Sequence, residues 1–125
     1  MGLETDTLVR LAEVPNILAI KEASANLNFV SDVASRLKGR LAILSGDDSL
    51  TLPIASVGGQ GVISVLSNLM PREMVAMVKK ALAGDLPGAQ KDHLHLFPLM
   101  KAMFLETNPI PVKTALAMIG TVQSE

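Results

Sequence analysis

A lysine ends one of the most apolar runs of this chain, and that position suits amine chemistry. Ile17-Leu18-Ala19-Ile20 leads directly into Lys21. A nearly continuous apolar run of this length is typical of a strand that is buried on both faces of a parallel sheet. Burial at the end of such a strand disfavours a charged ammonium, and a free amine can attack a carbonyl carbon. Lys21 is therefore a candidate nucleophile, with a solvated lysine at a strand end as the alternative.

Two further segments each follow an apolar run, as Lys21 does. The turn Gly46-Asp47-Asp48 follows the apolar run 41–44, and another segment follows the run 62–65. In parallel α/β proteins the functional residues lie at the carboxyl ends of the strands, on the loops that lead into the helices. We therefore expect these three strand ends to meet on one rim.

The elements that position these residues alternate along the chain. Strands are predicted over 17–21, 41–44 and 62–65, with helices between them, which indicates right-handed crossovers and a parallel α/β sheet. Caps are expected at Thr5, Asp6 or Thr7 for the first helix and at Asn26 for the second. The chain reads as one domain over 1–125, with βα units in 1–84 and C-terminal helices in 85–125. Helices are predicted over 8–12, 26–39, 52–57, 71–84, 87–106 and 112–119, with an extended connector over 107–111.

Composition narrows the class of protein. The 125 residues are 49% hydrophobic and 18% charged, which is typical of a folded globular chain. A net charge of −1 argues against a nucleic-acid partner, and no apolar run reaches the length of a membrane span. The absence of cysteine excludes disulfides and favours the cytoplasm.

Other motifs favour structural interpretations. His93 and His95 are two residues apart, so on a helix their rings diverge, and a metal site is not expected. The glycines at 58, 59 and 61 fit a tight helix-to-strand turn better than a phosphate-binding loop. Asp47 and Asp48 could hold Mg²⁺ in a phosphoacceptor module, but a helix cap is the favoured role.

Four motifs in this order resemble the dihydrodipicolinate synthase and N-acetylneuraminate lyase family of Schiff-base class I aldolases. They are Ile20-Lys21-Glu22-Ala23-Ser24, Leu44-Ser45-Gly46-Asp47-Asp48, Gly59-Gln60-Gly61-Val62-Ile63-Ser64-Val65 and Asn108-Pro109-Ile110-Pro111-Val112-Lys113. The resemblance covers nearly the whole chain. It implies a (β/α)8 barrel, of which this chain is the C-terminal half with about three parallel strands, covering helices and C-terminal helices. The Ser-Gly-Asp-Asp form favours the synthase branch.

The resemblance also implies roles for residues. Lys21 matches the lysine that forms an imine with pyruvate, after which loss of a methyl proton gives an enamine that adds to aspartate semialdehyde. Gly46 and Asp47 match a loop that lines the substrate end of the cleft, and Ile63 matches a position whose backbone faces the pyruvate. No cofactor and no metal are implied. Residues 108–113 match a segment with a structural role.

Parts of the family pattern are missing from this sequence. The chain has no tyrosine, whereas the family uses one as a proton shuttle beside the lysine. The Gly-Thr-Thr-Gly-Glu loop that holds the pyruvate carboxylate is also absent, as are the arginine for the second substrate and the upstream site of feedback by lysine. We therefore expect Lys21 to form the imine slowly and the chain to be weak or inactive alone.

Three strands also leave the sheet edges open. The chain must then rearrange into an open sheet, self-associate as a homo-oligomer, or dock on a separate N-terminal half. The alternative function is a catalytically silent α/β fragment that acts as an oligomerisation or interaction module.

Overall fold

The computed structural model describes residues 2–123, which form two compact units. The division lies between Ile63 and Ser64. The sequence pattern placed the βα units in 1–84 and the C-terminal helices in 85–125, and the organisation as a single domain stays a prediction. All predicted site residues lie in the first unit, so this unit alone positions the candidate site.

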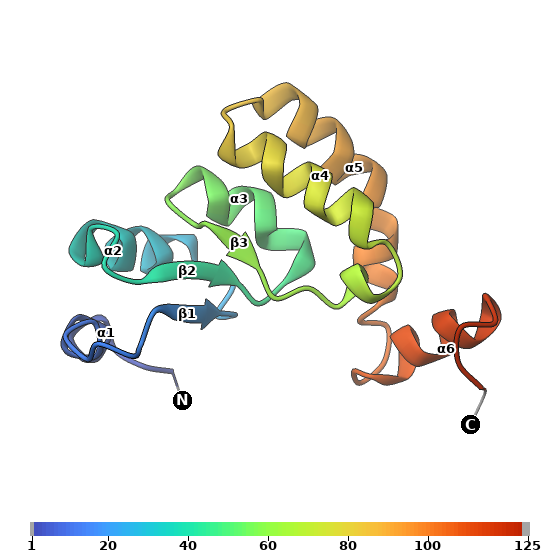
Figure 1. Ribbon diagram of the computed structural model, residues 1–125, viewed down its shortest axis with the longest axis horizontal. Helices are drawn as coiled ribbons and strands as arrows, with labels where there is room; N and C mark the ends of the chain where they lie inside the picture. The colour runs from blue at the N-terminus through green and yellow to red at the C-terminus, as the bar shows by residue number, and fades with distance from the viewer. Residues whose placement is uncertain (1, 124–125) are drawn as a thin grey trace. The chain divides into compact units, whose positions relative to one another are not determined.

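A parallel sheet organises the first unit (Figure 1). Its strands are β1 (Ala19–Glu22), β2 (Ala42–Ser45) and β3 (Gly61–Val62), in the order β1-β2-β3. Each pairing is parallel, so all three carboxyl ends point the same way. The register places Lys21 opposite Leu44.

Helices cover one face of this sheet. They are α1 (Thr5–Leu11), α2 (Leu27–Leu37) and α3 (Thr51–Ser56), the last preceded by the 3-10 turn η1 (Asp48–Leu50). Alternate strand residues on the covered face are buried, among them Ile43. Burial of such side chains from water is the main term that stabilises the unit. The core consists of Leu8, Val30, Val33, Leu37, Leu41, Ile43 and Ile54.

Local signals explain where the first two helices begin. Asn26 caps α2 by accepting a hydrogen bond from the backbone N–H of Phe29 at 3.1 Å, as predicted. The predicted side-chain cap of the first helix was wrong. Thr5, Asp6 and Thr7 all lie inside α1, whose N-cap, Glu4, makes no side-chain cap. Asp6 instead pairs with Arg36 of α2, which ties the two helices together.

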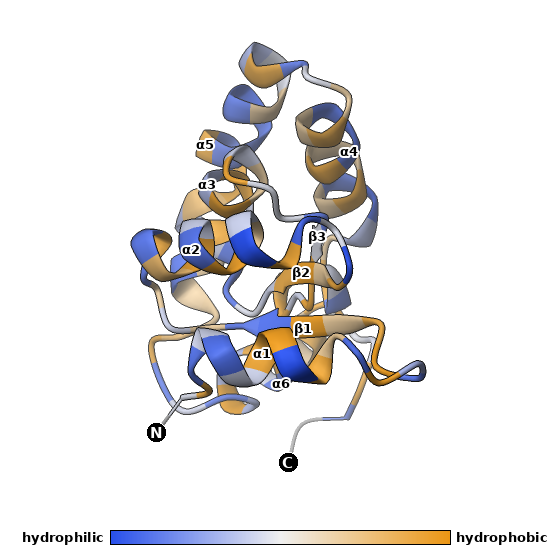
Figure 2. Ribbon diagram, turned by 90° about the vertical axis from the view of Figure 1, so that its left-hand side faces the viewer, coloured by the Kyte–Doolittle hydropathy of each residue, from blue (hydrophilic) through white to orange (hydrophobic). Residues whose placement is uncertain are grey.

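The second face of the sheet differs from the prediction that the first strand is buried on both faces. Along β1 the exposure alternates, with Ala19 and Lys21 exposed and Glu22 buried. Within this unit the helices pack on the face that carries Glu22, and none packs on the face that carries Lys21. The arrow of β1 changes from hydrophobic to hydrophilic at its carboxyl end (Figure 2).

The second unit is helical. It contains the 3-10 turn η2 (Leu66–Asn68) and the helices α4 (Pro71–Leu82), α5 (Leu86–Ala102) and α6 (Ile110–Met118). Helices α4 and α5 pack against each other and are linked by an ion pair between Lys80 and Asp92 at 2.7 Å. None of the helices over residues 2–123 has both the length and the apolar character needed to cross a membrane. The unit's buried apolar residues are Leu66, Met74, Met77, Ala89, Leu96, Met100, Met103 and Val112.

Several predicted element boundaries differ from the structure, and three of these differences lie in the part of the chain after residue 60. The strand expected over 62–65 is shorter and ends at Val62, because Ser64 turns the chain by accepting the N–H of Ser67 at 2.8 Å. The helix expected to reach residue 106 ends at Ala102. The connector expected over 107–111 is a turn with a cis Asn108–Pro109 bond, and α6 already begins at Ile110.

Candidate active site

Lys21 lies at the carboxyl end of β1 with its side chain exposed. The residue after it is different in character. Glu22 is only 5% exposed, and one of its carboxylate oxygens accepts the N–H of Ser24 at 2.6 Å. The other oxygen, Oε2, is buried without a hydrogen-bond partner among residues 2–123. The amine therefore stands on the open face of the sheet, while its neighbour anchors the chain on the covered face.

The turn after β2 lies directly beside Lys21. The N–H of Gly46 donates to the carbonyl oxygen of Glu22 at 2.6 Å, which joins the ends of β1 and β2 beyond their paired residues. Ser45 is fully buried, and its hydroxyl donates to the carbonyl oxygen of Asp47 at 2.7 Å. The turn is thus held by bonds on both sides of Gly46.

Asp47 forms a cap, as favoured from the sequence. Its Oδ1 accepts the backbone N–H of Ser49 at 2.8 Å and the hydroxyl of the same residue at 2.7 Å. These bonds satisfy groups at the start of η1 that the helical turn itself cannot pair. The neighbouring Asp48 is almost completely buried, so its carboxylate does not line an open site.

Ile63 joins the same rim from the third strand. Its N–H donates to the carbonyl oxygen of Ser45 at 2.8 Å, directly after the paired residues Ser45 and Val62. Side chains alternate along a strand, so Ile63 shares a face with Gly61, which pairs with Leu44, and hence with Lys21. Its side chain is 47% exposed.

The structure therefore places Lys21 and Gly46 side by side and Ile63 on the same face and rim. The third expected strand end lies at Val62, earlier than predicted. The sequence interpretation missed the buried residues Glu22 and Ser45, whose bonds hold the rim. Their signal was available, because polar residues adjoining apolar strands must find hydrogen-bond partners once they are buried.

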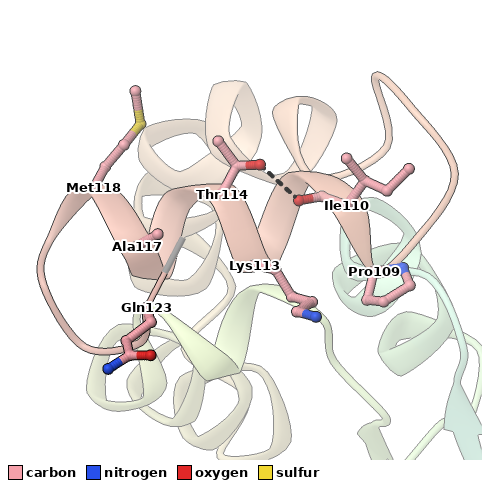
Figure 3. Close-up of a pocket in the computed structure, with 7 residues that line it drawn as sticks. All are labelled: Pro109, Ile110, Lys113, Thr114, Ala117, Met118 and Gln123. Carbon is pink, nitrogen blue, oxygen red and sulfur yellow. Dashed lines mark hydrogen bonds between the residues drawn. The ribbon is translucent and has the colours of Figure 1, made fainter. Parts of the chain in front are cut away.

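A groove of about 810 Å³ adjoins β1 and has Lys21, Glu22 and Ser24 among its lining residues, together with apolar side chains from α1 and α2. A separate hollow of about 660 Å³ lies along α6 in the second unit (Figure 3). It is lined by Pro109, Lys113 and Met118 among others, and contains none of the predicted site residues. The groove beside β1 therefore contains Lys21 but none of Gly46, Asp47 and Ile63, so it does not span the candidate site.

No group of three or more histidine, aspartate or glutamate side chains over residues 2–123 is arranged to hold a metal ion. His93 instead contacts the ring of Phe97, with centroids 5.7 Å apart, and burial lowers its pKa below the ordinary value of 6.5.

Comparison with known proteins connects this rim to a family. The model of the dihydrodipicolinate synthetase family matches residues 1–125. The 4-hydroxy-tetrahydrodipicolinate synthase of Methanocaldococcus jannaschii is 54% identical over 126 residues, covering 100% of this chain and 43% of the relative. The enzyme of the same name from Koribacter versatilis is 51% identical, covering 98% of this chain and 41% of the relative.

Two solved structures also superpose closely on this chain. The dihydrodipicolinate synthase of Aquifex aeolicus superposes with a TM-score of 0.94 at 46% identity, covering 98% of this chain and 42% of that one. The chloride-inhibited synthase of Acinetobacter baumannii, solved in complex with pyruvate, gives a TM-score of 0.94 at 37% identity over 98% of this chain and 42% of that one.

The chain thus spans about two fifths of the length of the relatives it matches. The predicted fold class is confirmed, since the three parallel strands and their helices superpose on part of these (β/α)8 barrel proteins. The resemblance seen in four short motifs extends over the whole sequence. The chain belongs to the dihydrodipicolinate synthetase family.

Proposed function

We propose that this chain carries the Schiff-base lysine of a lyase of the 4-hydroxy-tetrahydrodipicolinate synthase type. The observation that carries the proposal is the position of Lys21 at the carboxyl end of β1, beside the Gly46 turn and on the face shared with Ile63. The relatives bear the name of this synthase, and one was solved with pyruvate bound. A lysine on such a rim is accessible to a small 2-oxo acid.

In the proposed reaction the Lys21 amine attacks the keto carbon of pyruvate, and loss of water gives an iminium ion. The positive nitrogen accepts electrons when a base removes a proton from the pyruvate methyl group, so an enamine forms. This carbon nucleophile adds to the aldehyde carbon of aspartate semialdehyde, which restores the iminium ion. The amino group of the adduct then attacks the iminium carbon, closes the ring and expels the Lys21 amine. The backbone around Gly46, Asp47 and Ile63 would line the space that the two substrates occupy.

We further propose that a complementing N-terminal segment supplies the groups that this sequence lacks, a carboxylate-binding loop and a tyrosine. Positioned acid–base groups typically contribute about 10²- to 10⁴-fold to a rate. Lys21 alone is therefore expected to form the imine slowly, and the chain alone to turn over weakly or not at all.

The test is reductive trapping. Incubation with pyruvate and borohydride should attach one carboxyethyl group to Lys21, found by mass mapping of peptides. Lys21→Arg should abolish the adduct, whereas Lys38→Arg, which alters an exposed lysine at the end of α2, should leave it unchanged. Equal labelling of Lys21 and Lys38 would contradict the proposal, because it would reveal only the general reactivity of surface amines.

A second candidate function is an interaction module without catalysis. The observation that favours it is the number of large apolar side chains left in contact with water, such as Leu105 at 81% and Met118 at 83% exposure. Contact with a partner would remove such side chains from water. Trapping at Lys21 separates the two, since a silent module needs no reactive amine.

A further inference from the structure

The turn after β2 has no room for a side chain at position 46. A Cβ atom placed on Gly46 would lie 2.9 Å from Cε of Lys21, 2.8 Å from Cβ of Ala23 and 3.1 Å from the carbonyl oxygen of Glu22. Non-bonded carbon atoms prefer separations of about 3.5–4.0 Å. The φ angle of Gly46 is not in the left-handed region, so glycine is needed here for space and not for backbone freedom.

The backbone on each side of this contact is fixed. Gly46 donates its N–H to the carbonyl oxygen of Glu22 at 2.6 Å, and Glu22 pairs with Ser45 in the sheet. The buried carboxylate of Glu22 holds the next turn through the N–H of Ser24. Since Cβ of Ala23 and the carbonyl oxygen of Glu22 are fixed to the backbone, a methyl group at 46 must shift the backbone slightly and also displace the most flexible neighbour. That neighbour is the exposed side chain of Lys21.

We propose that Gly46 is a positioning residue for the Lys21 amine. The missing side chain leaves the space in which the methylene chain of Lys21 lies against the turn, and this path sets where the nitrogen stands on the rim. The inference deepens the proposed function, because its consequence for condensation depends on Lys21 being the nucleophile. The role differs from lining a substrate cleft, since Gly46 acts through Lys21 and not through contact with pyruvate.

The test substitutes Gly46→Ala and uses two measurements. Borohydride trapping of pyruvate at Lys21 should become slower on the order of 10²-fold, the loss that a misplacement of about 1 Å can cause. Separately, reductive methylation with ¹³C-formaldehyde gives each lysine an NMR signal. The Lys21 signal should move in Gly46→Ala while the Lys38 signal stays, and circular dichroism should show that the variant is folded.

The NMR measurement needs no pyruvate, so the two proposals can fail separately. If the unmodified chain is not trapped at Lys21, the proposed function fails, and the Lys21 signal still decides the role of Gly46. An unmoved Lys21 signal in Gly46→Ala would overturn the positioning role, whatever the trapping rate. A moved signal with an unchanged trapping rate would overturn it also, because the position of the amine would then not matter for condensation.

Gly59→Ala is the matched control. A Cβ atom on Gly59 would lie 2.5 Å from Cγ2 of Ile54, so the site is at least as crowded, but its close contacts do not include Lys21. Trapping per folded molecule and the Lys21 signal should both match the unmodified chain. Adding Ala23→Gly to Gly46→Ala removes one clash and leaves the clash with Lys21. If this double variant regains normal trapping and a normal signal, Ala23 and not the path of Lys21 is responsible, and the inference falls.

Discussion

Each of the three strand ends makes a different contribution to the candidate site. β1 contributes an amine, the turn after β2 contributes backbone and empty space at Gly46, and the end of β3 contributes the backbone of Ile63. The polar groups that hold this arrangement are Glu22, Ser45 and Asp47, none of which needs to touch a substrate to do so. A substitution at the rim can therefore act on stability, on the position of Lys21, or on both, and the readouts have to separate these effects.

Asp47 illustrates the distinction, because it was expected to line the cleft and is seen to cap η1. Asp47→Ala removes the acceptor for both bonds from Ser49, and loss of such a cap typically costs about 1 kcal/mol. The free energy of unfolding measured in urea should fall by roughly that amount, while Asp47→Asn, which keeps an acceptor, should lose less. Unchanged stability together with a large loss of pyruvate trapping would contradict the capping role and assign Asp47 to the substrate.

At the scale of elements, the helices pair through their buried faces and a few polar links. α4 and α5 contact each other, and Lys80 bonds to Asp92 across them. His93, the next residue of α5, is partly buried, and its Nδ1 is buried without a hydrogen-bond partner among residues 2–123. A charged imidazole is unfavourable there, and burial accordingly lowers its pKa in the folded chain.

This lowered pKa predicts a pH-dependent stability. Because the unfolded state binds the proton more readily, the contribution of neutral His93 is fully present above pH 6.5 and is lost as the pH falls from 6.5 toward the lowered pKa. The free energy of unfolding of the second unit, measured in urea between about pH 8 and about pH 5, should show the loss. His93→Gln should flatten this part of the profile, and His95→Gln, which removes an exposed imidazole from the same helix, should not. An unchanged slope in His93→Gln would exclude the mechanism.

The sequence predicted the elements better than their ends. Apolar runs at strand spacing identified all three strands, and Asn26 marked the start of α2, because these signals act over a few residues. The last strand and the helix that ends at Ala102 were predicted too long. Their apolar residues continue beyond the element, and local turns such as that of Ser64 decide where it stops. The exposure of the face that carries Lys21 was also missed. An apolar strand predicts that both faces of the sheet need to be buried, but it does not tell which element packs on each face.

At the scale of the whole molecule, this missing cover is the main physical constraint. Parallel sheets are found almost only with both faces covered or closed into a barrel. Here one face of the first unit carries Ala19, Lys21 and Ile63 in contact with water, and β1 and β3 are both edges of its sheet. Identical copies contribute strands in multiples of three and so cannot add up to eight, whereas a segment with the remaining strands can.

Association should therefore depend on which partner is present. Light scattering of the chain alone over a dilution series should show self-association at high concentration, because water-exposed apolar side chains lower their free energy by contact. The part of the Methanocaldococcus jannaschii relative that lies outside its match to this chain is the probe for complementation. Its addition should replace the self-associated species with a mixed complex and restore condensation of pyruvate with aspartate semialdehyde.

The control for this experiment is Lys21→Arg, which should bind the added segment equally well and restore no activity. Binding without activity in the unmodified chain would favour the interaction module over the lyase. A chain that stays monomeric at high concentration and ignores the added segment would contradict both functions. The open face would then be stable in water without a partner, against the general behaviour of parallel sheets.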